Sequence, residues 1–115
     1  MKILDRIVAI LIMLQGAIHG SFSSVFHGRY DGAGMWFLSG GLMMIFLGLL
    51  NLARAGSPGA AARWASLAAN VLGLAFVLGL VPLAPLRQNP QVAVAILLMA
   101  GATLFSLLRR GASAA

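Results

Sequence analysis

Residues 3–27, ILDRIVAILIMLQGAIHGSFSSVFH, form a long apolar run that ends in regularly spaced polar side chains. Four of these side chains recur at every fourth position: Gln15, His19, Ser23 and His27. On an α-helix of 3.6 residues per turn, each step of four residues drifts by about 40°, so the four side chains share roughly a third of the circumference. The run therefore predicts an apolar helix that carries one polar stripe.

The composition of the chain indicates that lipid covers much of its surface. Of the 115 residues, 61% are hydrophobic and 9% are charged, whereas soluble domains contain about 25% charged residues. A soluble domain of this size could not bury so much apolar surface. The sequence contains no cysteine, which excludes disulfides, thiolate metal ligands and cysteine nucleophiles.

Three further apolar runs follow the first, each near the length of about 20 residues that crosses a hydrocarbon layer of roughly 30 Å. None of the runs alternates polar and apolar residues as the strands of a membrane barrel do. The sequence therefore predicts an all-α integral membrane protein, an antiparallel four-helix transmembrane bundle in which residues 1–115 form a single domain. The expected helices span about 3–27, 35–52, 58–81 and 90–109.

The positions of the basic residues predict the orientation of this bundle. If both termini lie on one side, that side carries six basic residues: Lys2, Arg6, Arg54, Arg63, Arg109 and Arg110. The other side carries two, Arg29 and Arg87. Because basic residues accumulate on the cytoplasmic side, we expect both termini to be cytoplasmic, in a bacterial inner membrane. The charge of +6 does not indicate nucleic acid as a partner, because the basic residues stand at the ends of apolar runs.

Polar residues inside the apolar runs predict contacts between the helices. A rise of 1.5 Å per residue, applied to antiparallel helices, predicts three polar layers. They pair His19 with Ser39, Gln15 with Thr103, and Asn51 with Asn70. Hydrogen bonds of this kind are ordinary packing interactions in membranes, worth about 0.6 kcal/mol each on average. We therefore interpret Thr103 and the two asparagines as structural.

The polar stripe of the first helix predicts a pocket that opens outward between the first two helices. An ionisable group inside the membrane is costly and is a functional hypothesis by default, so His19 is open to a structural or a functional interpretation. The expected ligand-binding residues are Gln15, His19, Ser23, His27, Tyr30, Asp31, Trp36 and Ser39. On a straight helix the two histidines are about 12 Å apart, too far to share one metal ion. We expect no metal and no cofactor.

The function that these features favour is non-enzymatic. Asp5 and Asp31 are the only carboxylates and fall at opposite membrane faces, so no acid–base pair is expected within one chain. We expect an accessory subunit or a protein that binds a lipid or another hydrophobic small molecule. The alternatives are a small proton-linked transporter that uses His19 and, less favoured, a membrane enzyme. Small residues such as Gly16 and Gly20 predict tight helix packing, within the chain, in a homodimer or in a larger membrane complex.

Overall fold

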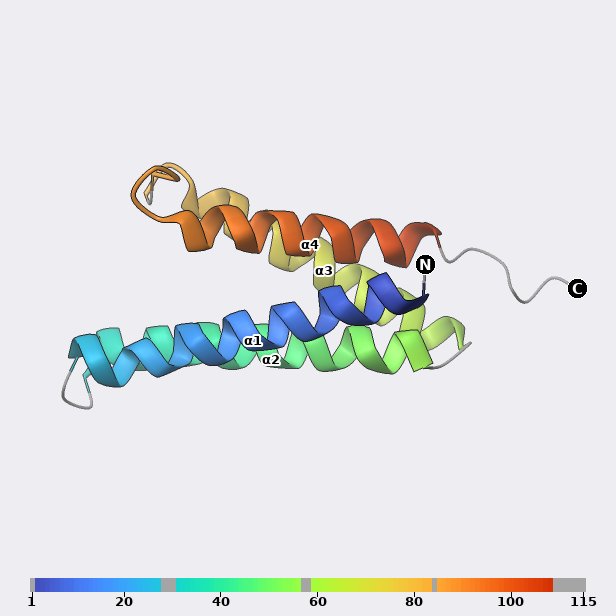
Figure 1. The fold of residues 1–115 in the computed structure, drawn as a ribbon, viewed down its shortest axis with the longest axis horizontal. Helices are drawn as coiled ribbons and strands as arrows, with labels where there is room; N and C mark the ends of the chain where they lie inside the picture. Colours follow the sequence, from blue (N-terminus) through green and yellow to red (C-terminus); the bar gives the residue numbers. More distant parts are fainter. Residues whose placement is uncertain (1, 28–30, 57–58, 84, 109–115) are drawn as a thin grey trace, which may run out of the picture.

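The computed structural model describes residues 2–27, 31–56, 59–83 and 85–108, and of residues 23–27 the backbone alone. These residues form four helices: α1 (Lys2–His27), α2 (Gly32–Gly56), α3 (Ala60–Leu80) and α4 (Pro90–Leu108) (Figure 1). Each is long and apolar enough to cross a membrane, which confirms the prediction of four apolar helices.

Helix α2 is longer than the sequence pattern predicts, and the extension at each end has a physical explanation. At its start, the Asp31 carboxylate accepts a hydrogen bond of 2.7 Å from the backbone N–H of Gly34. This bond caps the helix and includes residues 32–34 in it. At its end, Arg54 and Ala55 are buried, so the inward face of the helix continues past residue 52.

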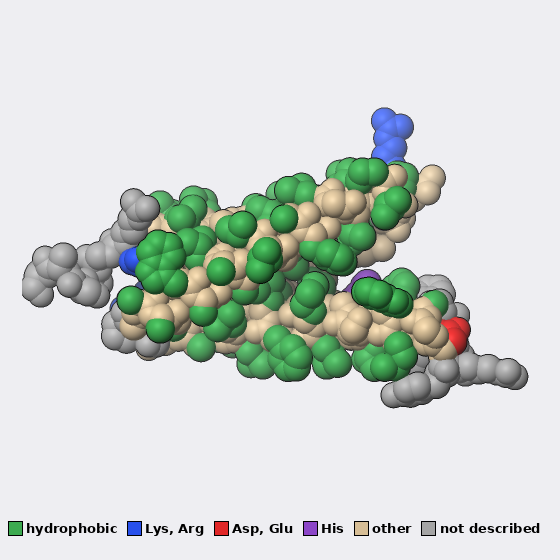
Figure 2. Space-filling model, turned by 180° about the vertical axis from the view of Figure 1, so that it is seen from behind, with side chains coloured by type: hydrophobic (Ala, Val, Ile, Leu, Met, Phe, Trp, Pro, Cys, Tyr) green, Lys and Arg blue, Asp and Glu red, His purple; other side chains and the backbone are tan. Residues whose placement is uncertain are grey.

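The four helices alternate in direction and form two hairpins, α1–α2 and α3–α4 (Figure 1). Contacts are most extensive within each hairpin, whereas α1–α4 and α2–α3 contacts connect the two. We call the end of the bundle that carries Lys2 and Leu108 the terminal end, and the end that carries Gly32 and Pro90 the opposite end. Figure 2 shows the two hairpins separating toward the opposite end.

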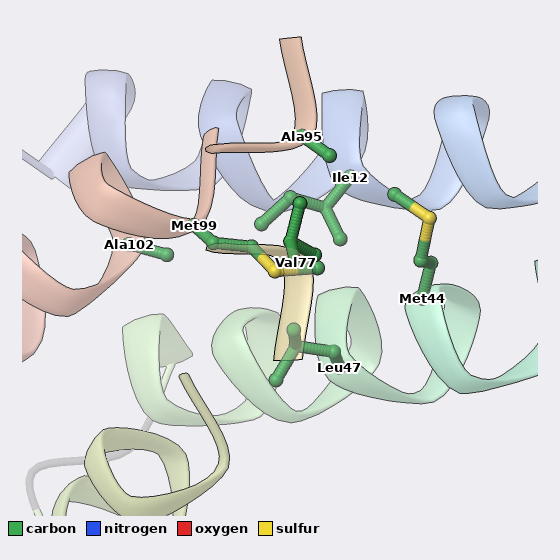
Figure 3. Close-up of a cluster of buried hydrophobic side chains, with 7 residues drawn as sticks. All are labelled: Ile12, Met44, Leu47, Val77, Ala95, Met99 and Ala102. Carbon is green, nitrogen blue, oxygen red and sulfur yellow. The ribbon is translucent and has the colours of Figure 1, made fainter. Parts of the chain in front are cut away.

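Each helix turns one narrow stripe inward. On three helices the buried positions follow the same spacing of four, seven and eleven residues: Asp5, Ala9, Ile12 and Gly16; Ser66, Asn70, Gly73 and Val77; Ala95, Met99, Ala102 and Ser106. This spacing follows one face of a helix. Apolar members of the stripes meet in a central cluster that includes Ile12, Leu47 and Met99 (Figure 3). Large apolar side chains such as Leu72 and Leu97 point outward and are more than 70% exposed.

Glycines bring the backbones of α1 and α2 into contact. A Cβ atom added at Gly41 would lie 2.6 Å from the carbonyl oxygen of Gly16 and 2.7 Å from the backbone nitrogen of Gly20. One added at Gly48 would lie 2.7 Å from the carbonyl oxygen of Ala9. Side chains at these positions would push the helices apart. At this level the backbones of α1 and α2 therefore leave no room for side chains between them.

Candidate functional site

The first part of the site is Gln15, which ties α1 to the first turn of α4. Its amide Nε2 donates a hydrogen bond of 2.7 Å to the backbone carbonyl of Gln91. A carbonyl accepts only from the NH₂ group of the amide, so this bond fixes which way the amide faces. The other amide atom, Oε1, is buried and has no hydrogen-bond partner among the residues that the structure describes.

The predicted layer of Gln15 with Thr103 is wrong. Thr103 donates to the carbonyl of Met99 in its own helix and lies about 18 Å along α4 from Gln91. The prediction assumed that the helices end at the same height. Helix α1 instead continues about 18 Å beyond Gln15, whereas α4 begins one residue before Gln91.

His19 follows one turn after Gln15 and faces α2. Its imidazole stacks on the ring of Phe37, with 4.8 Å between ring centroids and 16° between the planes. It also lies over Gly40, where an added Cβ atom would be 3.3 Å from Nε2. The side chain is half-buried, and no hydrogen bond to its ring is found within the described ranges. The imidazole is thus held in place by packing against Phe37 and Gly40. Its two ring nitrogens can bond to a ligand.

The remaining predicted site residues lie on α2 or outside the description. Asp31 caps α2, and Trp36 is 76% exposed. Ser39 is exposed and donates to the carbonyl of Trp36 at 2.8 Å, so its hydroxyl bonds within its own helix. The side chains of Ser23 and His27, and Tyr30 as a whole, lie outside the described residues.

An apolar groove of about 370 Å³ runs between α2 and α3 and therefore between the two hairpins. Its walls are Met43, Phe46, Leu47 and Leu50 from α2 and Ala69, Leu72, Gly73 and Phe76 from α3. Gly40, beneath His19, lies one turn beyond Met43 on the same side of α2. On α2, the groove wall at Met43 and the contact of His19 with Gly40 are therefore one helical turn apart.

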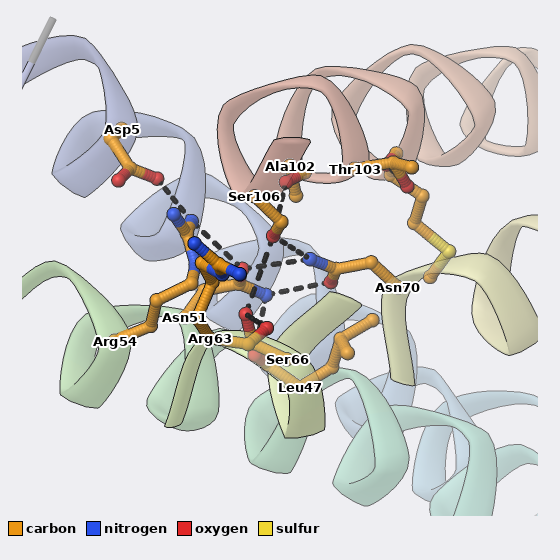
Figure 4. A network of polar contacts seen from close by, with 11 residues as sticks. Asp5, Leu47, Asn51, Arg54, Arg63, Ser66, Asn70, Ala102, Thr103 and Ser106 are labelled. Carbon is orange, nitrogen blue, oxygen red and sulfur yellow. Dashed lines mark hydrogen bonds and ion pairs between the residues drawn. The ribbon is translucent and has the colours of Figure 1, made fainter. Parts of the chain in front are cut away.

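A buried polar network lies on the terminal side of Leu50 (Figure 4). Within the described part of the chain it joins side chains from all four helices: Asp5, Asn51, Arg54, Ser66, Asn70 and Ser106. None of these residues is more than 2% exposed. Burial of polar groups is tolerated when they bond to one another, and this set does so.

The hydrogen bonds of the network connect the helices within each hairpin and, through Asn51 and Asn70, connect the two hairpins. Arg54 Nη2 donates to Asp5 Oδ1 at 2.5 Å and to Asn51 Oδ1 at 3.1 Å. The amides of Asn51 and Asn70 exchange two hydrogen bonds, of 2.7 and 2.9 Å, and Asn70 also donates to Ser106 Oγ at 3.1 Å. The Asn51–Asn70 pair therefore joins the hairpins beside Leu50 and Ala69, two residues of the groove wall.

The predicted contact between Asn51 and Asn70 is confirmed, whereas the positions of Asp5 and Arg54 correct the sequence interpretation. That interpretation places both charges at the membrane surface, but they are buried and paired. A signal was present in the sequence, because Asp5 precedes Ala9 and Ile12 by four and seven residues, and Arg54 follows Leu47 by seven. Each charge therefore continues the inward stripe of its helix.

A comparison of the chain with models of protein families, with curated proteins and with solved structures found no match.

Proposed function

We propose that this chain is an integral protein of a bacterial inner membrane with both termini in the cytoplasm. The exposed apolar side chains on the outer faces of the helices support insertion into lipid. Because Arg54 is paired with Asp5 in the interior, we leave it out when the basic residues on the two expected sides of the membrane are compared. In the sequence, five basic residues then remain on the side of the termini and two on the other side. This bias still favours a cytoplasmic terminal end.

Single cysteines test this orientation, because the chain has none of its own. Gln88→Cys and Ala61→Cys place a thiol at exposed positions at opposite ends of the bundle. In intact cells with a permeabilised outer membrane, a membrane-impermeant maleimide is expected to label the cysteine at 88. The cysteine at 61 is expected to react only after the inner membrane is opened. The reverse pattern would show that the termini face the periplasm.

Within the membrane, we propose that the protein binds an amphipathic, lipid-like molecule between its two hairpins. The observation that carries this proposal is an apolar groove whose α2 wall begins one turn from the contact of His19 with Gly40. Eight apolar residues line the groove, and its volume falls in the range of about 300–1,000 Å³ typical of small-molecule sites. At the end away from the network, Met43 in its α2 wall lies one turn from Gly40, which His19 contacts. We therefore expect a molecule with its apolar tail in the groove to place its polar head near the imidazole.

A binding role accounts for the described residues better than an enzymatic one. Asp5 is buried against Arg54, and Asp31 caps α2 at the other end of the bundle. General acid–base catalysis needs a group within hydrogen-bond distance of the reacting atoms, and neither carboxylate borders the groove. His19 remains as a polar contact for a bound molecule, which supports a binding or accessory protein.

Filling the groove tests the proposal. Ala69 lines the groove, whereas its neighbour Ala68 is exposed and lies outside it. Native mass spectrometry of protein extracted in mild detergent is expected to show one lipid-like molecule bound per chain. Ala69→Phe is expected to lower its occupancy about tenfold or more, because the added ring occupies the same space. Ala68→Phe is expected to leave the occupancy unchanged.

Two outcomes would contradict the binding proposal. One is wild-type protein that carries no bound molecule, and the other is equal occupancy in the two phenylalanine variants. If the protein is empty and vesicles show solute uptake that depends on pH and is lost in His19→Ala, the proton-linked transporter is the better interpretation.

A further inference from the structure

We propose that the polar head of the bound molecule carries a hydroxyl group, an alcohol or a phenol, and that Gln15 Oε1 accepts its hydrogen bond. This inference rests on the proposed function, because it concerns the head of the molecule whose tail lies in the groove. It adds the chemical class of the ligand and names Gln15 as the residue that selects it.

The hydrogen bond from Gln15 to Gln91 fixes the direction of the Gln15 amide. Its NH₂ group donates to the carbonyl of Gln91, and a carbonyl can only accept. The amide therefore cannot turn over without losing that bond. As a result Oε1, and not Nε2, is the atom of Gln15 that is left to contact a ligand.

The Oε1 atom of Gln15 is buried and has no hydrogen-bond partner in the described part of the chain. A buried acceptor without a donor is unfavourable, and native structures rarely keep one without a reason. Oε1 accepts only, so the partner that it lacks must be a donor. Ethers, esters and ketones have no hydrogen to offer, whereas an alcohol or a phenol does.

His19 lies one turn beyond Gln15 along α1. No hydrogen bond to its ring is found in the ranges described. A neutral imidazole has one donor and one acceptor nitrogen, so it can bond to the oxygen of the hydroxyl that donates to Gln15. A single hydroxyl, which both donates and accepts, thus satisfies the two residues together.

The way in for this hydroxyl lies between α1 and α4. Oε1 is closed to solvent in this conformation, and the bond from Gln15 to the Gln91 carbonyl joins the two helices at this height. At the other end of the bundle the two bonds between Asn51 and Asn70 join the hairpins. The proposal therefore requires α1 and α4 to separate at the opposite end when the hydroxyl enters, while these bonds hold the hairpins together at the terminal end.

The test uses two probes that differ in the hydroxyl hydrogen, cetyl alcohol and cetyl methyl ether, added to the full chain in detergent micelles. Binding is read by native mass spectrometry. Wild-type protein is expected to bind the alcohol about fivefold or more tightly than the ether, the effect of one hydrogen bond. Gln15→Met, which keeps the length of the side chain and removes the acceptor, is expected to abolish this preference.

Two further variants serve as controls for a loss of binding that is caused by a change of fold. Ser21→Ala removes a hydroxyl that bonds to the carbonyl of Ala17 on the exposed side of the same helix, and it is expected to keep the preference. Gln15→Glu, protonated at mildly acidic pH, offers one donor and one acceptor in place of the amide and is also expected to keep it.

The outcomes separate this inference from the proposed function. Equal binding of the alcohol and the ether to wild-type protein would overturn the inference and leave groove binding intact. A preference for the alcohol that survives in Gln15→Met would also overturn it, since another residue would then accept the bond. If neither probe binds and the extracted protein carries no lipid-like molecule, the proposed function itself fails.

Discussion

Replacing Arg54 with methionine is expected to lower the free energy of unfolding by about 3–5 kcal/mol, because it removes the guanidinium that pairs with the buried Asp5 carboxylate. The guanidinium is 1% exposed, and its Nη2 bonds to both Asp5 and Asn51. Removing it takes a donor from each of these side chains. The measurement is denaturation by SDS in mixed micelles, followed by far-ultraviolet circular dichroism.

The double variant Asp5→Leu with Arg54→Met is expected to recover most of that loss. Buried ion pairs replaced by apolar side chains of similar volume are often neutral in stability, because the desolvation penalty of two charges disappears with them. Asn51 still exchanges two hydrogen bonds with Asn70 in this variant. A double variant that is as unstable as Arg54→Met alone would show that the ion pair itself, and not an isolated charge, determines stability.

Arg63→Met is the matched control for this experiment. Arg63 is also on the terminal side of the bundle, but it is only partly buried, and its guanidinium stacks on the ring of Trp64 at 4.9 Å. Its replacement is expected to change stability by no more than about 1 kcal/mol. A loss at Arg63 equal to that at Arg54 would mean that positive charge at this end matters more than burial.

The sequence predicts the four helices well because length and hydropathy are properties of each run by itself. It also predicts the contact of Asn51 with Asn70. Counting at 1.5 Å per residue down the second apolar run and up the third places both asparagines near the inner edge of the lipid layer. Their helices are consecutive in the sequence, which keeps the error of this count small enough for the two side chains to be paired.

The contact of Gln15 depends on the axial position of one hairpin relative to the other, and the sequence of a single apolar run does not determine that position. Gln15 meets Gln91 instead of Thr103 because α1 extends well beyond α4. The pairing of Asp5 with Arg54 is missed for a different reason. Charges near the ends of apolar runs usually mark the membrane surface, and only their match to the buried spacing distinguishes these two.

Replacing Gly41 with alanine is expected to lower the free energy of unfolding by about 1–3 kcal/mol through overpacking. The new Cβ atom would lie 2.6 Å from the carbonyl oxygen of Gly16 and 2.7 Å from the backbone nitrogen of Gly20. Both are backbone atoms, which cannot rotate away as a side chain does, so α1 must move off α2. The same denaturation experiment measures the loss.

Gly79→Ala provides the control with the same chemical change. Gly79 lies within α3, and a Cβ atom added there meets nothing within 4 Å. The substitution is expected to be neutral or to stabilise by less than about 1 kcal/mol, since alanine favours a helix more than glycine does. Equal effects of the two substitutions would contradict the backbone contact between α1 and α2.

Combining Gly41→Ala with Gly16→Ala separates steric contact from a general loss of glycine. A Cβ atom at Gly16 would lie 2.6 Å from the carbonyl oxygen of Gly41, so the two substitutions strain one shared contact. Once the first has moved α1 away, the second meets more space, and the double variant is expected to lose less than the sum of the single losses. Strictly additive losses would mean that each glycine acts on its own helix and that the close approach contributes little.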